Sequence, residues 1–213
     1  YPKNYLKGVR KICDEFGIMM ICDEVMAGWY RTGKMFAYMN FDVTPDIITF
    51  AKGVNSGYIP LGGCIVKNEI AHFFDDKYLS CGLTYSGHPL ACAAGVACQE
   101  FYLKNDIESH VQKVGKHLGK KLEELKAKHK SIGDVRYIGL FSGIELVKDR
   151  ETREPLVPWG QDPKGIMGAI VKELKSRGFF TYSHENVIIV APPLIITEAQ
   201  IDEELEKLDD VLS

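Results

Sequence analysis

An acidic and a basic side chain each lie at the end of an apolar run in the first quarter of the chain. Asp23 closes the run GIMMICDEV (17–25), and Lys52 follows DIITFA (46–51). Open α/β sheets bind ligands at the carboxyl ends of their strands, so an acid and a lysine that meet there could serve a cofactor. Each residue alone also has an ordinary structural role, as a cap or a solvated strand end.

The elements that would position this pair are predicted by hydrophobic periodicity. Residues 3–16 have apolar side chains at three- and four-residue spacing, which predicts an amphipathic helix that ends at Gly17. The continuous apolar runs 17–25, 46–52 and 62–68 indicate strands buried on both faces, as is typical of parallel sheets. This first part of the chain is therefore predicted to be an α/β structure.

The pattern changes near residue 100. Long helices are predicted over 88–105 and 106–130, and shorter elements follow. We expect two parts, an α/β part at 1–100 and an α+β part at 101–213. The shorter elements are strands at 134–139 and 140–147 joined at Gly139, a loop at 149–163, a helix at 164–178, strands at 179–183 and 187–192, and a terminal helix capped by Thr197 and Gln200.

Composition excludes several classes of protein. The 213 residues include 26 Lys and Arg against 29 Asp and Glu, a net charge of −3, and 46% are hydrophobic. These values argue against disorder and give no electrostatic case for a nucleic-acid partner. No apolar run reaches the ~20 residues of a membrane helix. The six cysteines form no CxxC pair, so we expect free thiols, a cytoplasmic protein and no metal site.

A long stretch around the pair carries a family resemblance. The segment DEVMAGWYRTGKMFAYMNFDVTPDIITFAKGVNSGYIPLGG, with LTYSGHPLACAA and APPLIITEAQID further on, resembles the class III aminotransferases, which use pyridoxal 5′-phosphate (PLP). The separated motifs occur in the family's order and span nearly the whole chain. The resemblance implies the PLP-dependent transferase fold type I, with 1–100 as the C-terminal part of the large α/β domain and 101–213 as the small α+β domain.

The resemblance also implies site residues. Lys52 is the expected Schiff-base lysine, and it is also expected to carry the proton between substrate and cofactor. Asp23 is expected to keep the pyridine nitrogen protonated, and Val25 to pack on one ring face. Thr84 matches the threonine that reaches the cofactor phosphate of a neighbouring subunit, which implies a homodimer. The implied substrates are a small amine or amino acid donor and a 2-oxo acid.

Two departures from the family pattern are visible. Family members are about twice as long, and their N-terminal half carries the phosphate-binding loop, so the chain resembles a C-terminal half that we expect to be inactive alone. Ile189 stands two residues before APPL, where many users of 2-oxoglutarate have an arginine. This difference favours an ω-amine or taurine-like donor with pyruvate as acceptor.

Other functions stay open at this level. A non-catalytic dimerisation or binding fragment of the same fold, or a PLP-dependent aminomutase or decarboxylase, would carry the same lysine and aspartate. A nucleotide triphosphatase is disfavoured, because Met35 follows the GxxxxGK-like stretch 28–34 where a P-loop needs Ser or Thr.

Overall fold

The computed structural model describes residues 2–163 and 165–213. The chain divides into two compact units. The units are Tyr1–Glu108 and Ser109–Ser213. Their assignment to a large and a small domain stays a prediction. Among the helices in the described part of the chain, none combines the length and apolarity that crossing a membrane requires.

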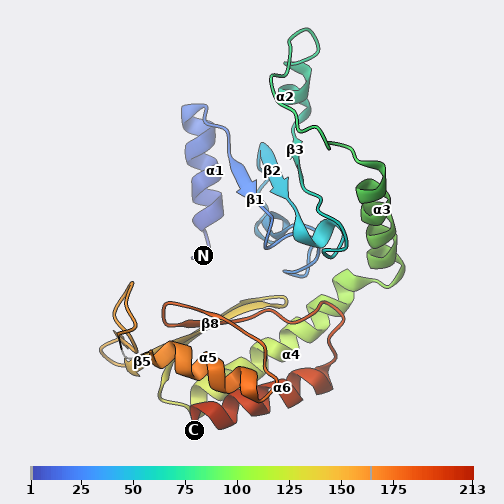
Figure 1. The fold of residues 1–213 in the computed structure, drawn as a ribbon. Coiled ribbons are helices and arrows are strands. Elements are labelled where there is room, and N and C mark those ends of the chain that lie inside the picture. Colours follow the sequence, from blue (N-terminus) through green and yellow to red (C-terminus); the bar gives the residue numbers. More distant parts are fainter. Residues whose placement is uncertain (1, 164) are drawn as a thin grey trace. The chain divides into compact units, whose positions relative to one another are not determined.

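The first unit is built on a three-stranded sheet with the order β1-β2-β3 (Figure 1). Strand β1 (Ile21–Asp23) is parallel to β2 (Ile47–Phe50), and β3 (Gly63–Val66) is antiparallel to β2. The other elements are α1 (Tyr5–Phe16), the 3₁₀ helices η1 (Ala37–Phe41) and η2 (Lys52–Val54), α2 (Asn68–His72) and α3 (Pro89–Lys104).

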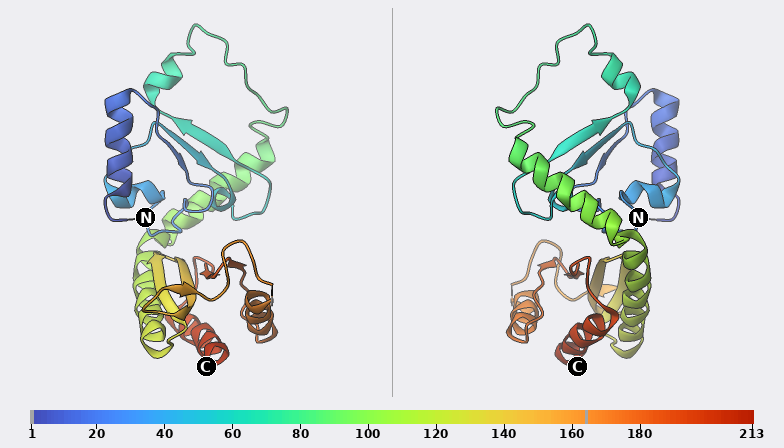
Figure 2. Two further views of the ribbon diagram at one scale, coloured as in Figure 1. Left: turned by 90° about the vertical axis from the view of Figure 1, so that its left-hand side faces the viewer. Right: turned by 90° about the vertical axis from the view of Figure 1, so that its right-hand side faces the viewer.

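Helix α1 forms as the apolar periodicity predicts, and it ends at Gly17 in the left-handed conformation with φ 63°. Its residues Leu6 and Val9 pack against a small core of Cys13, Met20 and Val43 beside β1. Residues 73–88 then connect α2 to α3 without regular secondary structure (Figure 2).

Asp46 ties the start of β2 to its neighbours. Its carboxylate accepts hydrogen bonds from Lys67 Nζ at 2.6 Å, Arg10 Nη1 at 2.7 Å and the Met20 backbone N–H at 2.7 Å. The bond from Lys67, followed by that from Met20, holds the pKa of Asp46 well below its usual range. This cluster fixes β1 and β3 against β2, and with them the two strand ends that carry Asp23 and Lys52.

The expectation that all three strands are buried on both faces is wrong for this chain. Ile21 in β1 and Ile65 in β3 are exposed, as is Met19 just before β1. The apolar runs were sound evidence for strands, but burial depends on what covers a sheet, and the described residues of this unit do not cover both faces. These side chains therefore mark surfaces that further structure could cover.

The second unit packs helices on an antiparallel sheet with the order β4-β5-β8-β7, and β6 pairs with β5. Its core is lined by the α4 stripe of Val111, Val114, Leu118 and Leu122, all buried as the periodicity predicts. The elements are α4 (Ile107–Lys128), β4 (Ile132–Ile138), β5 (Phe141–Asp149), β6 (Glu154–Pro155), α5 (Ile166–Ser176), β7 (Ser183–His184), β8 (Val187–Val190) and α6 (Glu198–Leu212).

Local predictions in this unit are mostly confirmed. Gly139 has φ 56° in the turn between β4 and β5. Thr197 and Gln200 form the expected reciprocal capping box at the start of α6. The predicted strand at 179–183 is wrong, because β7 begins only at Ser183. The first residue of the helix predicted over 164–178, Lys164, lies outside the described residues.

Candidate functional site

The structure brings Asp23 and Lys52 to one edge of the first unit's sheet. Asp23 is the last residue of β1 and is paired with Thr49 of the parallel strand β2. The Glu24 N–H then donates to the Thr49 carbonyl at 2.8 Å. Lys52 follows two residues after the end of β2. Both side chains therefore belong to the carboxyl ends of neighbouring parallel strands, which is where ligands bind in such sheets.

The Asp23 carboxylate and the Lys52 amine are accessible and form few hydrogen bonds. One oxygen of Asp23, Oδ1, accepts the Val25 backbone N–H at 3.0 Å. Within residues 2–163 and 165–213, neither the Asp23 Oδ2 atom nor the Lys52 Nζ atom has a hydrogen-bond or ion-pair partner, and both residues are exposed. A carboxylate oxygen with accepting capacity and an amine without a counter-ion suit a ligand that carries a protonated nitrogen and an aldehyde.

Lys52 is held in an unusual backbone conformation. Its φ is 44°, in the left-handed region that side chains other than glycine rarely adopt. The loop that follows Lys52 is held in place by hydrogen bonds to one of its own buried side chains. Asn55, which is almost fully buried, donates from Nδ2 to the Ile59 carbonyl at 2.6 Å and accepts the Gly57 N–H at 3.3 Å. Such strain clusters at functional sites, where the surrounding structure enforces it.

Glu24 is a structural residue of the site that the sequence did not single out. Its side chain is 2% exposed, and its carboxylate oxygens accept the Ala37 and Tyr38 backbone N–H groups, each at 2.9 Å. These are the first N–H groups of η1, so Glu24 caps that short helix. The apolar run around Asp23 gave no signal for this role, because the strand ends at Asp23 and the two donors lie 13 and 14 residues after Glu24.

The residues after Glu24 pack against the loop that carries Lys52. Trp29 is buried against Phe36 and Phe50, with ring centroids 5.1 and 5.4 Å away. A Cβ built on Gly53 would lie 2.7 Å from the Trp29 Cβ, so only glycine fits directly after Lys52 without displacement. The bulky Trp29 side chain thus packs directly against the backbone that follows Lys52.

The neighbouring thiol is a weak competitor for nucleophilic chemistry. Burial, followed by the charge of Glu24, raises the pKa of the Cys22 thiol above its ordinary value. A thiol with a raised pKa carries less thiolate near neutral pH, and the thiolate is the reactive form. Cys22 also packs against the core of Cys13, Met20 and Val43, so it is a poor candidate nucleophile at this strand end.

Val25 and Thr84 are placed less simply. The strand ends at Asp23, so Val25 lies in the following turn and is half-buried, not on a continuing strand as expected. The reason is local: Asp23 accepts the Val25 N–H, and the Gly28 N–H closes a turn on the Glu24 carbonyl at 2.9 Å. Thr84 is exposed in the 73–88 connection.

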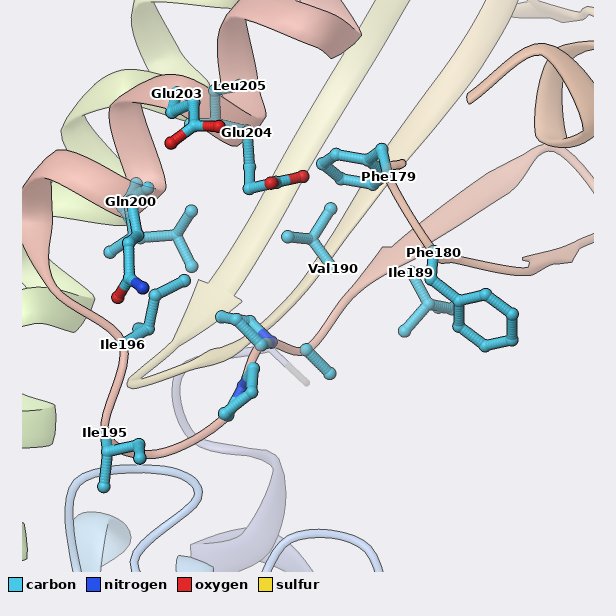
Figure 3. A pocket seen from close by; sticks show the side chains of 15 residues that line it. Phe179, Phe180, Ile189, Val190, Ile195, Ile196, Gln200, Glu203, Glu204 and Leu205 are labelled. Carbon is cyan, nitrogen blue, oxygen red and sulfur yellow. The ribbon is translucent and has the colours of Figure 1, made fainter. Parts of the chain in front are cut away.

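A separate pocket of about 820 Å³ lies within the second unit (Figure 3). Its walls come from β8, the Pro192–Pro193 segment and α6, and they include Ile189, Phe179 and Phe180. The charged residues of the lining are Glu203 and Glu204, and Glu204 is paired with Lys207 at 2.6 Å. The lining offers no cationic group that could hold a carboxylate.

A comparison with protein families decides the identity of this arrangement. Residues 1–212 match the family model described as aminotransferase class-III. The chain belongs to the class III aminotransferase family. The motifs around Asp23 and Lys52 that suggested the resemblance are thus part of a match over nearly the full chain.

Relatives in this family include enzymes with different substrates. The chain is 37% identical to a taurine–pyruvate aminotransferase of Bilophila wadsworthia, over 98% of this chain and 47% of the relative. It is 40% identical to an acetylornithine aminotransferase of Caldanaerobacter subterraneus subsp. tengcongensis, over 98% of this chain and 48% of the relative. The chain thus spans about half the length of these class III relatives.

Solved structures confirm the fold class. A taurine:2-oxoglutarate aminotransferase from Bifidobacterium kashiwanohense, solved in complex with PLP and glutamate, is 54% identical with a TM-score of 0.96, over 99% of this chain and 47% of that one. A transaminase from the marine bacterium Virgibacillus is 35% identical with a TM-score of 0.92, over 99% of this chain and 48% of that one. The predicted α/β fold of PLP-dependent transferases is therefore confirmed.

Proposed function

We propose that the full-length protein containing this chain is a PLP-dependent aminotransferase that moves an amino group from an amine donor to a 2-oxo acid. The observation that carries the proposal is the placement of Asp23 and Lys52 at the carboxyl ends of two adjacent parallel strands in a class III family member. PLP, when bound, supplies an electron-withdrawing ring that stabilises negative charge on the substrate carbon.

The chain's own residues have distinct tasks in this proposal. The Lys52 amine attaches the cofactor and, once released, moves a proton at the substrate carbon. The Asp23 carboxylate holds a proton on the pyridine nitrogen through the oxygen that the Val25 N–H leaves available. Val25 would pack on one face of the PLP ring, and the Thr84 hydroxyl would help to hold the phosphate of the cofactor in a neighbouring subunit.

The donor is proposed to be taurine or a similar ω-amine. Two relatives, at 54% and 37% identity, are taurine aminotransferases by name. Their acceptors differ, being 2-oxoglutarate in one and pyruvate in the other. Ile189 lines the pocket of the second unit, and its apolar side chain cannot bind a second carboxylate as arginine would. This residue supports pyruvate, whereas the relative at higher identity supports 2-oxoglutarate, so both acceptors belong in the assay.

A homodimer completes the proposed site. Most side chains of helix α3 before Gln99 are apolar, and such surfaces are normally buried. Its side chains Leu90, Val96, Phe101 and Leu103 are exposed, directly after the connection that carries Thr84. A second subunit packed on α3 would cover them and bring Thr84 to the neighbouring cofactor.

All six cysteines are free thiols, which supports a reducing compartment such as the cytoplasm.

An amino-transfer assay tests the proposal. PLP-loaded full-length protein is incubated with ¹⁵N-labelled taurine, a primary ω-amine or an α-amino acid, together with pyruvate or 2-oxoglutarate, and labelled alanine or glutamate is measured. We expect label transfer from taurine and its loss in Lys52→Arg, which keeps the charge but removes the nucleophile. The exposed Lys120→Arg serves as the matched control. Absence of transfer from every donor, or full turnover by Lys52→Arg, would refute the proposal.

A further inference from the structure

The loop that carries Lys52 contains two non-glycine residues with left-handed backbones. Lys52 has φ 44° and Ser56 has φ 54°. Each such conformation costs free energy, and it persists only where the surroundings enforce it. Backbone hydrogen bonds inside the loop, such as that from the Val54 N–H to the Ala51 carbonyl at 3.1 Å, account for only part of this restraint.

Helix α3 supplies the rest by capping two consecutive carbonyls after Lys52. The Tyr102 hydroxyl donates to the Gly53 carbonyl at 2.8 Å, and Gln99 Nε2 donates to the Val54 carbonyl at 2.9 Å. Residues 99 and 102 are three apart and therefore lie on the same face of α3. The helix thus contacts the backbone of η2 through two side chains, each of which caps one of its three carbonyls.

The hydroxyl network fixes the direction of each hydrogen bond. A phenol has one proton, and Tyr102 donates it to the Gly53 carbonyl, which can only accept. The Ser56 hydroxyl must therefore donate to Tyr102 Oη at 2.8 Å, and the Cys98 thiol to Ser56 Oγ at 3.3 Å. Burial raises the pKa of Tyr102 to about 12, so the phenol stays a donor at every pH where the enzyme would work. The network thus ties the loop to α3 at Ser56, the second strained position, and at Gly53 and Val54, the two residues that follow Lys52.

Packing holds Tyr102 in place for this task. Its ring is 5% exposed and meets the Tyr30 ring edge-on, with centroids 5.4 Å apart. About two turns before Tyr102 on the same face, a Cβ on Gly95 would lie 3.2 Å from Leu61 Cδ2. The small residue lets α3 approach the loop closely enough for Tyr102 and Gln99 to reach the carbonyls.

We propose that Tyr102 and Gln99 are positioning residues that hold the backbone of Lys52 in its left-handed conformation and so aim its amine at the cofactor. The inference rests on the proposed function, because it assigns a purpose to the orientation of Lys52. Neither residue touches the reacting atoms; both act through the carbonyls of Gly53 and Val54. The chemistry of Lys52 should therefore change when the caps are lost, even though its own side chain is intact.

The test uses Tyr102→Phe in the full-length protein, which keeps the ring and its contact with Tyr30 but removes the hydroxyl. Tyr137→Phe is the matched control, because its phenol forms no hydrogen bond within the described residues and lies in the second unit. Hydrogen–deuterium exchange of residues 52–59 is measured first, without cofactor. We expect Tyr102→Phe to speed exchange of these amides about fivefold to tenfold, as for one lost hydrogen bond, and Tyr137→Phe to leave it unchanged.

The second readout is spectroscopic and follows PLP bound to the same variants. A misplaced Lys52 amine should shift the pH midpoint of the cofactor's absorbance change and lower kcat more than it raises KM. A role in folding alone would move neither the midpoint nor the kcat-to-KM split. Unchanged exchange and an unchanged midpoint in Tyr102→Phe, with PLP still on Lys52, would overturn the inference.

Failure of the proposed function would look different. In that case neither wild type nor variant would carry PLP on Lys52, while the exchange of residues 52–59 would still respond to Tyr102→Phe. If Tyr102→Phe does not fold, Gln99→Leu is used in its place. This change removes the hydrogen bond to the Val54 carbonyl, and it replaces the half-buried Gln99 by a side chain of similar size. The same pair of measurements then decides the inference, with a smaller exchange effect of about twofold to fivefold expected.

Discussion

Replacing Glu24 by glutamine should destabilise the first unit, although the two side chains have nearly the same shape. The carboxylate accepts one backbone N–H on each oxygen, from Ala37 and Tyr38 at 2.9 Å, inside a site that is 2% exposed. Glutamine has one oxygen and one NH₂ group, so it can satisfy only one of these donors. The NH₂ group would face the second N–H, donor against donor.

The magnitude follows from these two bonds. Hydrogen bonds to a charged group contribute roughly 1.5–3 kcal/mol each, and a buried donor without a partner costs about 1–3 kcal/mol. We therefore expect Glu24→Gln to lower the free energy of unfolding by about 2–4 kcal/mol. Glu24→Ala should cost more, because it leaves both donors unsatisfied and opens a cavity.

Urea denaturation followed by circular dichroism and tryptophan fluorescence measures this loss. Trp29 lies against Phe36, the residue before the capped helix, so its emission reports on the same region. Glu15→Gln is the matched control: Glu15 is exposed on α1, and its change should stay within about 0.5 kcal/mol. A Glu24→Gln protein within that same margin of wild type would refute the capping argument.

Two further predictions concern Asp23 and Asp46. Asp23→Asn should lower kcat by about 10²-fold or more while most PLP is retained, because the carboxylate mainly stabilises charge that develops during the reaction. Steady-state kinetics measures kcat, and cofactor absorbance measures the amount of bound PLP. The pKa of Asp46 is depressed in the folded state. Its stabilisation is therefore fully present above its unfolded pKa of about 4 and is lost as pH falls through the folded value. Asp46→Asn should lower stability at neutral pH and flatten its decline in acid, as urea midpoints across pH would show.

Clear results would contradict these two predictions. Near-normal turnover by Asp23→Asn would remove the role assigned to its carboxylate. An acid decline in Asp46→Asn as steep as that of wild type would mean that other carboxylates control it. Asp209 is one such carboxylate, since hydrogen bonds from Lys128 and then His129 also hold its pKa below the usual range.

Local sequence signals predicted the elements well, because each depends on near neighbours. Gly17 ends α1 and Thr197 begins α6 through contacts within four residues. Burial was predicted less well, since Ile21 and Ile65 lie on strands as expected but face solvent. The strand predicted at 179–183 was also largely wrong, because only Ser183 of these residues belongs to β7.

The site shows the same division between local and distant contacts. Asp23 and Lys52 could be found because each follows an apolar run and matches a family motif. Tyr102 could not, since its partner Gly53 is 49 residues away and nothing in the helical pattern of α3 distinguishes a capping tyrosine from a core one. Glu24 was similarly hidden, because its donors belong to a short 3₁₀ helix with no apolar repeat.

The central claim is that Lys52 holds the cofactor. The most direct test reduces the PLP-loaded full-length protein with borohydride, digests it and maps the modified peptide by mass spectrometry. We expect one pyridoxyl group per chain on the peptide that contains Ala51-Lys52-Gly53, and none in Lys52→Arg. A pyridoxyl group on Lys34 or Lys67, with Lys52 unmodified, would contradict the account.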